Sequence, residues 1–252
     1  MGRLREASLA QRPESDGDAH PAGAALRRSS RVRESLSKLK RSNLPPEKPS
    51  NTVRLCLAGG IAVFPVGAGT ILFAIESTKH FAWTGQNISS LLNGPEGLVV
   101  SAGMVASGLL ATTFTYGLRE SLPRRSIPYD IGAGLFAITG VALVGAGIIH
   151  PPGAAHYSLA GTYFLGSAAT QSVIGADMVS KGSKALGGFG LGTAAVALAA
   201  VATGFIENHH VPAIYEFIGS ISTGTWMLVT SASALVRKRL GVPIGKKQEP
   251  IR

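Results

Sequence analysis

Five of the six histidines of this chain lie in or beside three short segments that separate apolar stretches. They are His80, His150, His156, His209 and His210, and the acids Glu76, Glu207 and Glu216 stand close to them. Imidazole and carboxylate groups are the side chains that bind zinc or transfer protons. These residues would form one site if the elements between them bring the three segments together.

The sharpest chemical hypothesis is a zinc site that acts on a lipid head group. Its candidate ligands are His150, His156, His209, His210 and Glu216. No H-E-x-x-H motif and no pair of cysteines accompanies them, and His150 and His156 are not four residues apart, as two ligands on one helical face would be. A proton-handling or interfacial role of these histidines therefore stays open beside the metal hypothesis.

Glu216 is the first candidate for a catalytic or proton-handling residue, and His156 is the second. Glu216 has apolar neighbours on both sides in the run from Pro212 to Gly219. A carboxylate that enters hydrocarbon costs a few kcal/mol unless it is paired, protonated or hydrated. We expect a partner for it, with His156 or His150 as the candidate, and the alternative is a carboxylate hydrated just above the acyl region.

The elements that must position these residues are six charge-free stretches. The run from Ile131 to Ala176 has 46 residues without Lys, Arg, Asp or Glu, and His150-Pro-Pro-Gly153 interrupts it. A span needs about 20 apolar residues, so this run predicts two spans joined by a tight turn. The six predicted spans cover about residues 55–75, 97–118, 128–149, 156–177, 185–206 and 213–236.

The stretch predicted as the fourth span is unusually polar. Tyr163, Ser167, Thr170 and Gln171 recur in it at helical spacing and predict one polar face. Such a face must point into the bundle or into a water-filled cavity. Hydrogen bonding between helices and a translocation path are the two interpretations.

The distribution of basic residues predicts an orientation. The net charge is +10, and 23 of the 24 Lys and Arg residues lie in the two tails and in two alternate connecting segments, whereas Lys79 is in one of the other three. The positive-inside rule then places both termini in the cytoplasm of a cell-membrane protein. We expect a disordered basic tail over residues 1–52 that could contact anionic lipid head groups, a basic tail over 237–252, and no nucleic-acid partner.

Thirty-two glycines are typical of closely packed membrane helices. Gly188 and Gly192 form a G-x-x-x-G pair, and Gly132, Gly140, Gly145 and Gly147 lie along the third predicted span. These faces predict tight packing between helices and offer a surface for a homo- or hetero-oligomer.

Two apolar stretches carry a resemblance to a known family. The run from Gly140 to His150 and the run from His156 to Gly166 resemble the third and fourth spans of an uncharacterised six-span membrane family of bacteria and archaea, a domain of unknown function. Ile88-Ser-Ser-Leu91 and Tyr215-Glu-Phe-Ile-Gly219 are similar to its other recurring pieces. The resemblance covers about Val53 to Val236, implies the six-helix topology, and implies no established reaction.

The sequence therefore predicts an all-α polytopic protein, a six-helix transmembrane bundle over residues 53–236. We expect a non-catalytic protein or a small carrier that handles protons. One alternative is a metal-dependent lipid hydrolase with an outward-facing His and Glu site, for which zinc would be the cofactor. A second alternative is an accessory subunit of a larger membrane complex.

Overall fold

The computed structural model describes residues 50–121, 126–208 and 211–240, and they contain helices and no strands. The prediction of an all-helical chain is confirmed. The elements are α2 (Asn51–Ser77), the 3-10 helix η1 (Ile88–Asn93), α3 (Gly97–Ser121), α4 (Ile127–Ile148), α5 (Ala154–Ser180), α6 (Lys184–Asn208) and α7 (Ala213–Leu240). The predicted tails over 1–52 and 237–252 lie outside the described residues, except that α2 already begins at Asn51 and α7 continues to Leu240.

The six long helices coincide to within a few residues with the six charge-free stretches. The predicted reversal after the third stretch is present, because α4 ends at Ile148 and α5 begins at Ala154. The bond between Pro151 and Pro152 in this turn is cis. Among the described residues, four helices are long and apolar enough to cross a membrane, namely α2, α3, α4 and α6. This composition is that of a membrane-spanning protein.

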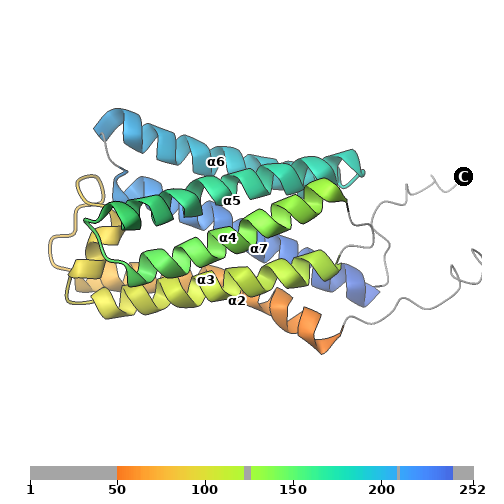
Figure 1. Ribbon diagram of the computed structural model, residues 1–252, viewed down its shortest axis with the longest axis horizontal. Coiled ribbons are helices and arrows are strands. Elements are labelled where there is room, and N and C mark those ends of the chain that lie inside the picture. The colour runs from red at the N-terminus through yellow and green to blue at the C-terminus, as the bar shows by residue number, and fades with distance from the viewer. Residues whose placement is uncertain (1–49, 122–125, 209–210, 241–252) are drawn as a thin grey trace, which may run out of the picture. The chain divides into compact units, whose positions relative to one another are not determined.

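The long helices form a closed ring. Each helix packs against the next one along the chain, and α7 packs against both α6 and α2, which closes the ring. Consecutive helices run in opposite directions, so the start of α2 and the end of α7 lie at the same end of the bundle (Figure 1). The helix α7 also contacts α3, α5 and η1, and it therefore links elements from all parts of the ring.

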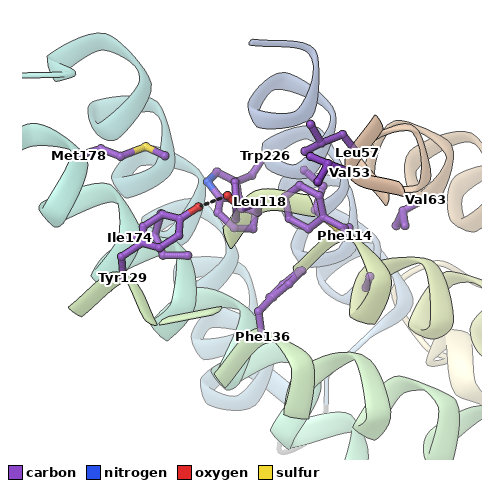
Figure 2. Packing of buried hydrophobic residues seen from close by; sticks show 12 residues of the cluster. Val53, Leu57, Val63, Phe114, Leu118, Tyr129, Phe136, Ile174, Met178 and Trp226 are labelled. Carbon is purple, nitrogen blue, oxygen red and sulfur yellow. Dashed lines mark hydrogen bonds between the residues drawn. The ribbon is translucent and has the colours of Figure 1, made fainter. Parts of the chain in front are cut away.

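Three aromatic rings fill the middle of the bundle. Phe114 of α3, Phe136 of α4 and Trp226 of α7 meet edge to face, with ring centroids 5.3 to 5.9 Å apart. This is a favoured geometry for aromatic pairs. Nearby, the buried Tyr129 donates a hydrogen bond of 3.0 Å from its hydroxyl to the carbonyl oxygen of Leu118, which ties α4 to α3 (Figure 2). Large apolar side chains thus fix the positions of three helices.

Glycines set the separation of neighbouring helices. A Cβ on Gly108 of α3 would lie 2.6 Å from the carbonyl oxygen of Gly140 in α4, and a Cβ on Gly187 of α6 would lie 2.5 Å from that of Gly175 in α5. The backbones approach so closely that no side chain fits between them. Gly188 and Gly192, the predicted contact pair, face no other atom within 4 Å of their Cβ positions. The contact to α5 is made by the adjacent Gly187 instead.

The segment between α2 and α3 covers one end of the bundle. Ile88, Leu91 and Leu92 of η1 are buried there against Ala74 of α2 and Val100 of α3. The backbone N–H groups of Ala213 and Ile214 donate to the carbonyl oxygens of Gln86 and Trp83, at 2.6 and 3.1 Å. This segment is therefore fastened to the start of α7, and we call it the η1 cover, residues 83–93.

The opposite end of the bundle carries the ion pairs of the described residues. Asp177 of α5 is 8% exposed, accepts a hydrogen bond from Ser126, and lies 2.7 Å from the Nζ atom of Lys181. Arg119 and Asp130 form a second pair at 2.9 Å, and both side chains are exposed. These acids therefore join helix ends, and the exposed pair contributes about 0–1 kcal/mol to stability.

Candidate functional site

A partly open cavity of about 100 Å³ lies between the helices of the ring. Residues of α2, α3, α4, α5, α7 and η1 line it, and α6 contributes none. Most of the wall is apolar and includes the rings of Phe64, Phe136, Phe164 and Phe217. Apolar cavities with a few polar groups between helices of a bundle are typical binding sites for small molecules.

His156 is the buried histidine of the cavity wall. It lies in the first turn of α5 and is 0% exposed. Its Nδ1 atom is 2.6 Å from the carbonyl oxygen of Ile149, directly after the end of α4. Its Nε2 atom is also buried and has no hydrogen-bond partner among the described residues. The ring is thus held at one nitrogen, and the other nitrogen is left for a ligand.

The contact with Ile149 determines which nitrogen carries the hydrogen. A carbonyl oxygen only accepts, so Nδ1 must be the donor in this contact. In the neutral ring, Nε2 then has a lone pair and no hydrogen. A buried acceptor without a partner costs about 1–3 kcal/mol, so a hydrogen-bond donor supplied from outside the chain would bind favourably at Nε2.

Glu216 also lines the cavity, from the first turn of α7. Its side chain is half-buried, and its Oε2 atom accepts a hydrogen bond of 2.5 Å from the backbone N–H of Ile88. Ser89, the next residue of η1, also lines the cavity. These are the first residues of η1, where no side chain of Asn87 caps the helix. Glu216 therefore caps a helix that lies 128 residues earlier in the chain.

The hydrogen-bond partner of Glu216 is thus the backbone N–H of Ile88 in η1, in place of the expected histidine. Neither ion pair seen among the described residues includes Glu216. His156 and Glu216 nevertheless line the same cavity, one from α5 and one from α7. The structure places these two candidate residues around a single space.

The other three candidate metal ligands are not in the cavity wall as far as the structure describes them. His150 is exposed in the turn before α5, and His209 and His210 lie outside the described residues. Among the residues that the structure covers, no group of three or more His, Cys, Asp or Glu side chains could hold a metal ion. The proposed zinc set of five residues therefore stays a hypothesis that depends on His209 and His210.

The polar face predicted for the fourth stretch does point into the bundle. Ser167, Thr170 and Gln171 are each at most 1% exposed, and Tyr163 lines the cavity. Gln171 donates from Nε2 to the hydroxyl oxygen of Thr223 in α7 at 3.1 Å. The buried hydroxyl of Ser167 has no partner in the described part of the chain. Hydrogen bonding between α5 and α7 accounts for part of this face.

Sequence reasoning missed the contribution of Ile88, Ser89 and Ser107. Ser107 of α3 is 4% exposed, lines the cavity, and its hydroxyl has no partner within the described ranges. A serine in an apolar stretch of small residues gives no indication of its direction. The short run Ile88-Ser-Ser-Leu-Leu92 between two charge-free stretches was the available sign that this connection packs onto the bundle.

The chain is similar to known proteins at the level of a family. A family model described as "Protein of unknown function (DUF998)" matches residues 41–233, which include His156, Glu216 and all of η1. The searches among curated proteins and among solved structures gave no match. The prediction of an uncharacterised family is confirmed, and the chain belongs to the DUF998 family of proteins of unknown function.

Proposed function

We propose that this protein is a small, non-catalytic carrier of the cell membrane that handles protons. The cavity is its binding site, and His156 and Glu216 are its protonatable groups. The observation that carries the proposal is that these two side chains, from α5 and α7, line one cavity between the helices. Intramembrane ionisable residues that face a cavity are typical of proton relays and substrate sites.

The proposal includes six membrane spans. The helices α5 and α7 have 27 and 28 residues and so are about 40 Å long, which exceeds the roughly 30 Å hydrocarbon thickness. They are less apolar than the other four because hydroxyl and amide side chains such as Gln171, Thr223 and Ser231 face the interior. A closed ring of antiparallel helices supports a membrane path for all six.

The orientation with both termini in the cytoplasm is supported by charge. The even number of spans puts the start of α2 and the end of α7 on one side, and the basic tails over 1–52 and 237–252 are the most cationic parts of the chain. On the cytoplasmic leaflet these tails would contact anionic head groups. The η1 cover and His156 then belong to the outer side.

The test is proton flux into liposomes that contain the full chain. Potassium-loaded liposomes with an entrapped pH-sensitive dye are made inside-negative with valinomycin, and internal acidification is recorded. We expect faster acidification than in protein-free liposomes, and we expect Glu216→Gln and His156→Gln to slow it to the protein-free rate. Each variant must elute as the wild type does, which shows that it is folded.

The matched control is Glu76→Gln, because Glu76 is exposed at the end of α2 and is outside the cavity wall. This variant should conduct protons at the wild-type rate. A wild-type protein no faster than empty liposomes would contradict the proposal. Equal slowing in Glu76→Gln would also contradict it, because the effect would then not belong to the cavity.

A second candidate function is that of an accessory subunit. It is favoured by one side of α6, where Cβ atoms on Gly188 and Gly192 would meet no atom of the described residues within 4 Å. Small residues on a lipid-facing helix allow close approach of another helix. The lipid hydrolase has weaker support, because the described residues bring together His156 and Glu216 and not the full set of proposed zinc ligands.

A further inference from the structure

We infer that the cavity binds a small alkylammonium ion whose N–H groups meet His156 Nε2 and the Glu216 carboxylate. This inference rests on the proposed function, in which the cavity is the binding site. It names the chemical class of the ligand: a cation with several hydrogen-bond donors and a short apolar body. Each of these three properties follows from a separate feature of the wall.

The hydrogen-bond donors of the ligand follow from two of the polar groups that line the cavity, those of His156 and Glu216. His156 Nε2 is a buried acceptor without a partner, because Nδ1 donates to the Ile149 carbonyl oxygen. A carboxylate accepts about four hydrogen bonds, and Glu216 receives one from the backbone N–H of Ile88 in η1. Both groups can therefore accept further hydrogen bonds. An ammonium group has only donors to offer, and it matches this pair better than a group that also accepts.

The positive charge follows from the absence of a cationic partner for Glu216 among the described residues. The ion pairs of that part of the chain, at Asp130 and Asp177, lie at the opposite end of the helices. Lys79 is the nearest basic residue in sequence to the η1 cover, and it is exposed. Backbone N–H groups stabilise the carboxylate without neutralising it, so a ligand that carries the missing charge gains from binding.

The short apolar body follows from the size and lining of the cavity. A cavity of about 150 Å³ holds benzene, so about 100 Å³ accommodates a molecule of about four non-hydrogen atoms. The wall contains the rings of Phe64, Phe164 and Phe217. Aromatic faces attract cations as well as alkyl groups. Water alone is a poor occupant of this apolar wall, because a buried water needs two to four polar partners.

The experiment compares three molecules of the same shape with four non-hydrogen atoms. Isopropylammonium is a cationic donor, 2-propanol is a neutral donor and acceptor, and acetone is an acceptor only. Each is titrated at pH 7 into the full chain, labelled with ¹⁵N-histidine and held in lipid nanodiscs. The ¹⁵N resonance of His156 Nε2, assigned by its loss in His156→Gln, reports a donor at that nitrogen.

We expect a saturable shift with isopropylammonium at a Kd on the order of 1 mM, since so small a ligand has few contacts. 2-Propanol should bind about tenfold more weakly, and acetone should give no saturable shift. Glu216→Gln should weaken isopropylammonium binding by about tenfold or more, because it removes the negative charge. It should leave 2-propanol binding unchanged, because the amide keeps an acceptor oxygen for a neutral donor.

A variant that fills the cavity tests the location. Ala160→Leu places a larger side chain in the wall without changing His156 or Glu216, and should abolish the shift. Ala199→Leu, on the exposed side of α6, is the matched control and should bind as the wild type does.

The inference is wrong if 2-propanol or acetone binds as tightly as isopropylammonium, or if none of the three gives a saturable shift. It is also wrong if Glu216→Gln weakens the cation and the alcohol equally, because the carboxylate would then act only through the η1 cover. Proton flux without ammonium binding would contradict the proposed ligand and would not contradict the proposed carrier function. Ammonium binding without proton flux would contradict the proposed carrier function and would not contradict the proposed ligand.

Discussion

His156 and Glu216 are both oriented by the backbone of another segment. A carbonyl oxygen at the end of α4 holds the ring of His156, and the N–H of Ile88 at the start of η1 holds the carboxylate of Glu216. Both residues also line the cavity. A hydrogen bond to the backbone of another segment restricts a side chain to one orientation. Binding sites depend on side chains that are held in this way.

The contact of Glu216 with η1 predicts a local effect of mutation. Replacing Glu216 with Gln removes the charge from the hydrogen bond to the Ile88 N–H, which should cost about 1–2 kcal/mol of local stability. We expect hydrogen exchange of the η1 amides, residues 88–93, to accelerate several-fold in nanodiscs. Exchange in the middle of α4 and α6 should not change.

The same measurement on Glu76→Gln is the control, because Glu76 is an exposed carboxylate outside the cavity wall. If both variants exchange alike at η1, the carboxylate of Glu216 does not hold the cover in place.

At the scale of elements, the ring depends on close contacts between backbones. The pairs Gly108 with Gly140 and Gly175 with Gly187 bring α3 to α4 and α5 to α6 without intervening side chains. A ring built in this way leaves the larger side chains of α3, α4 and α7 to fill the centre. The cavity is the part of the centre that they do not fill.

Two adjacent glycines of α6 provide a matched test of this packing. A Cβ at residue 187 would lie 2.5 Å from the Gly175 carbonyl oxygen, whereas a Cβ at residue 188 meets nothing within 4 Å. Both Gly187→Ala and Gly188→Ala gain about 1 kcal/mol in helix propensity, so this term cancels between them. We expect Gly187→Ala to be less stable than Gly188→Ala by about 1–3 kcal/mol, because α5 and α6 must separate. Thermal unfolding in detergent measures the difference.

Equal stability of the two variants would contradict the close contact between α5 and α6. A loss of stability in Gly188→Ala that depends on protein concentration would show that this face is covered by another molecule. That result would favour the accessory subunit over the carrier.

At the scale of the whole molecule, the distribution of charge and the closed ring together predict the orientation in the membrane. The exposed Thr84 precedes η1 at one end of the bundle, and the exposed Lys184 begins α6 at the other. In a Cys56→Ser background, we expect a membrane-impermeant maleimide to label Thr84→Cys in intact cells. Lys184→Cys should be labelled only after the cells are permeabilised.

Labelling of both cysteines in intact cells would contradict six spans with both termini in the cytoplasm. Labelling of Lys184→Cys alone would invert the orientation and place the η1 cover on the cytoplasmic side. The positive-inside rule makes labelling of Thr84→Cys alone in intact cells the expected pattern.

Much of the helical architecture could be predicted from the sequence. Six charge-free stretches, the Pro-Pro-Gly reversal and the polar spacing of Tyr163, Ser167, Thr170 and Gln171 are local properties of the chain. The cost of placing charges in hydrocarbon and of continuing a helix through two prolines acts on each stretch by itself. The helix bounds and the inward polar face of α5 could therefore be inferred without tertiary information.

The site itself was decided by tertiary structure. His150 and His156 are six residues apart and chemically identical, yet the first is exposed in the turn and the second is buried against the carbonyl oxygen of Ile149. Glu216 finds its partner 128 residues away, and the cavity exists because the side chains of five long helices and η1 do not fill their common centre. Burial, distant hydrogen bonds and imperfect packing are sums over many contacts between segments, so no local pattern of the sequence specifies them.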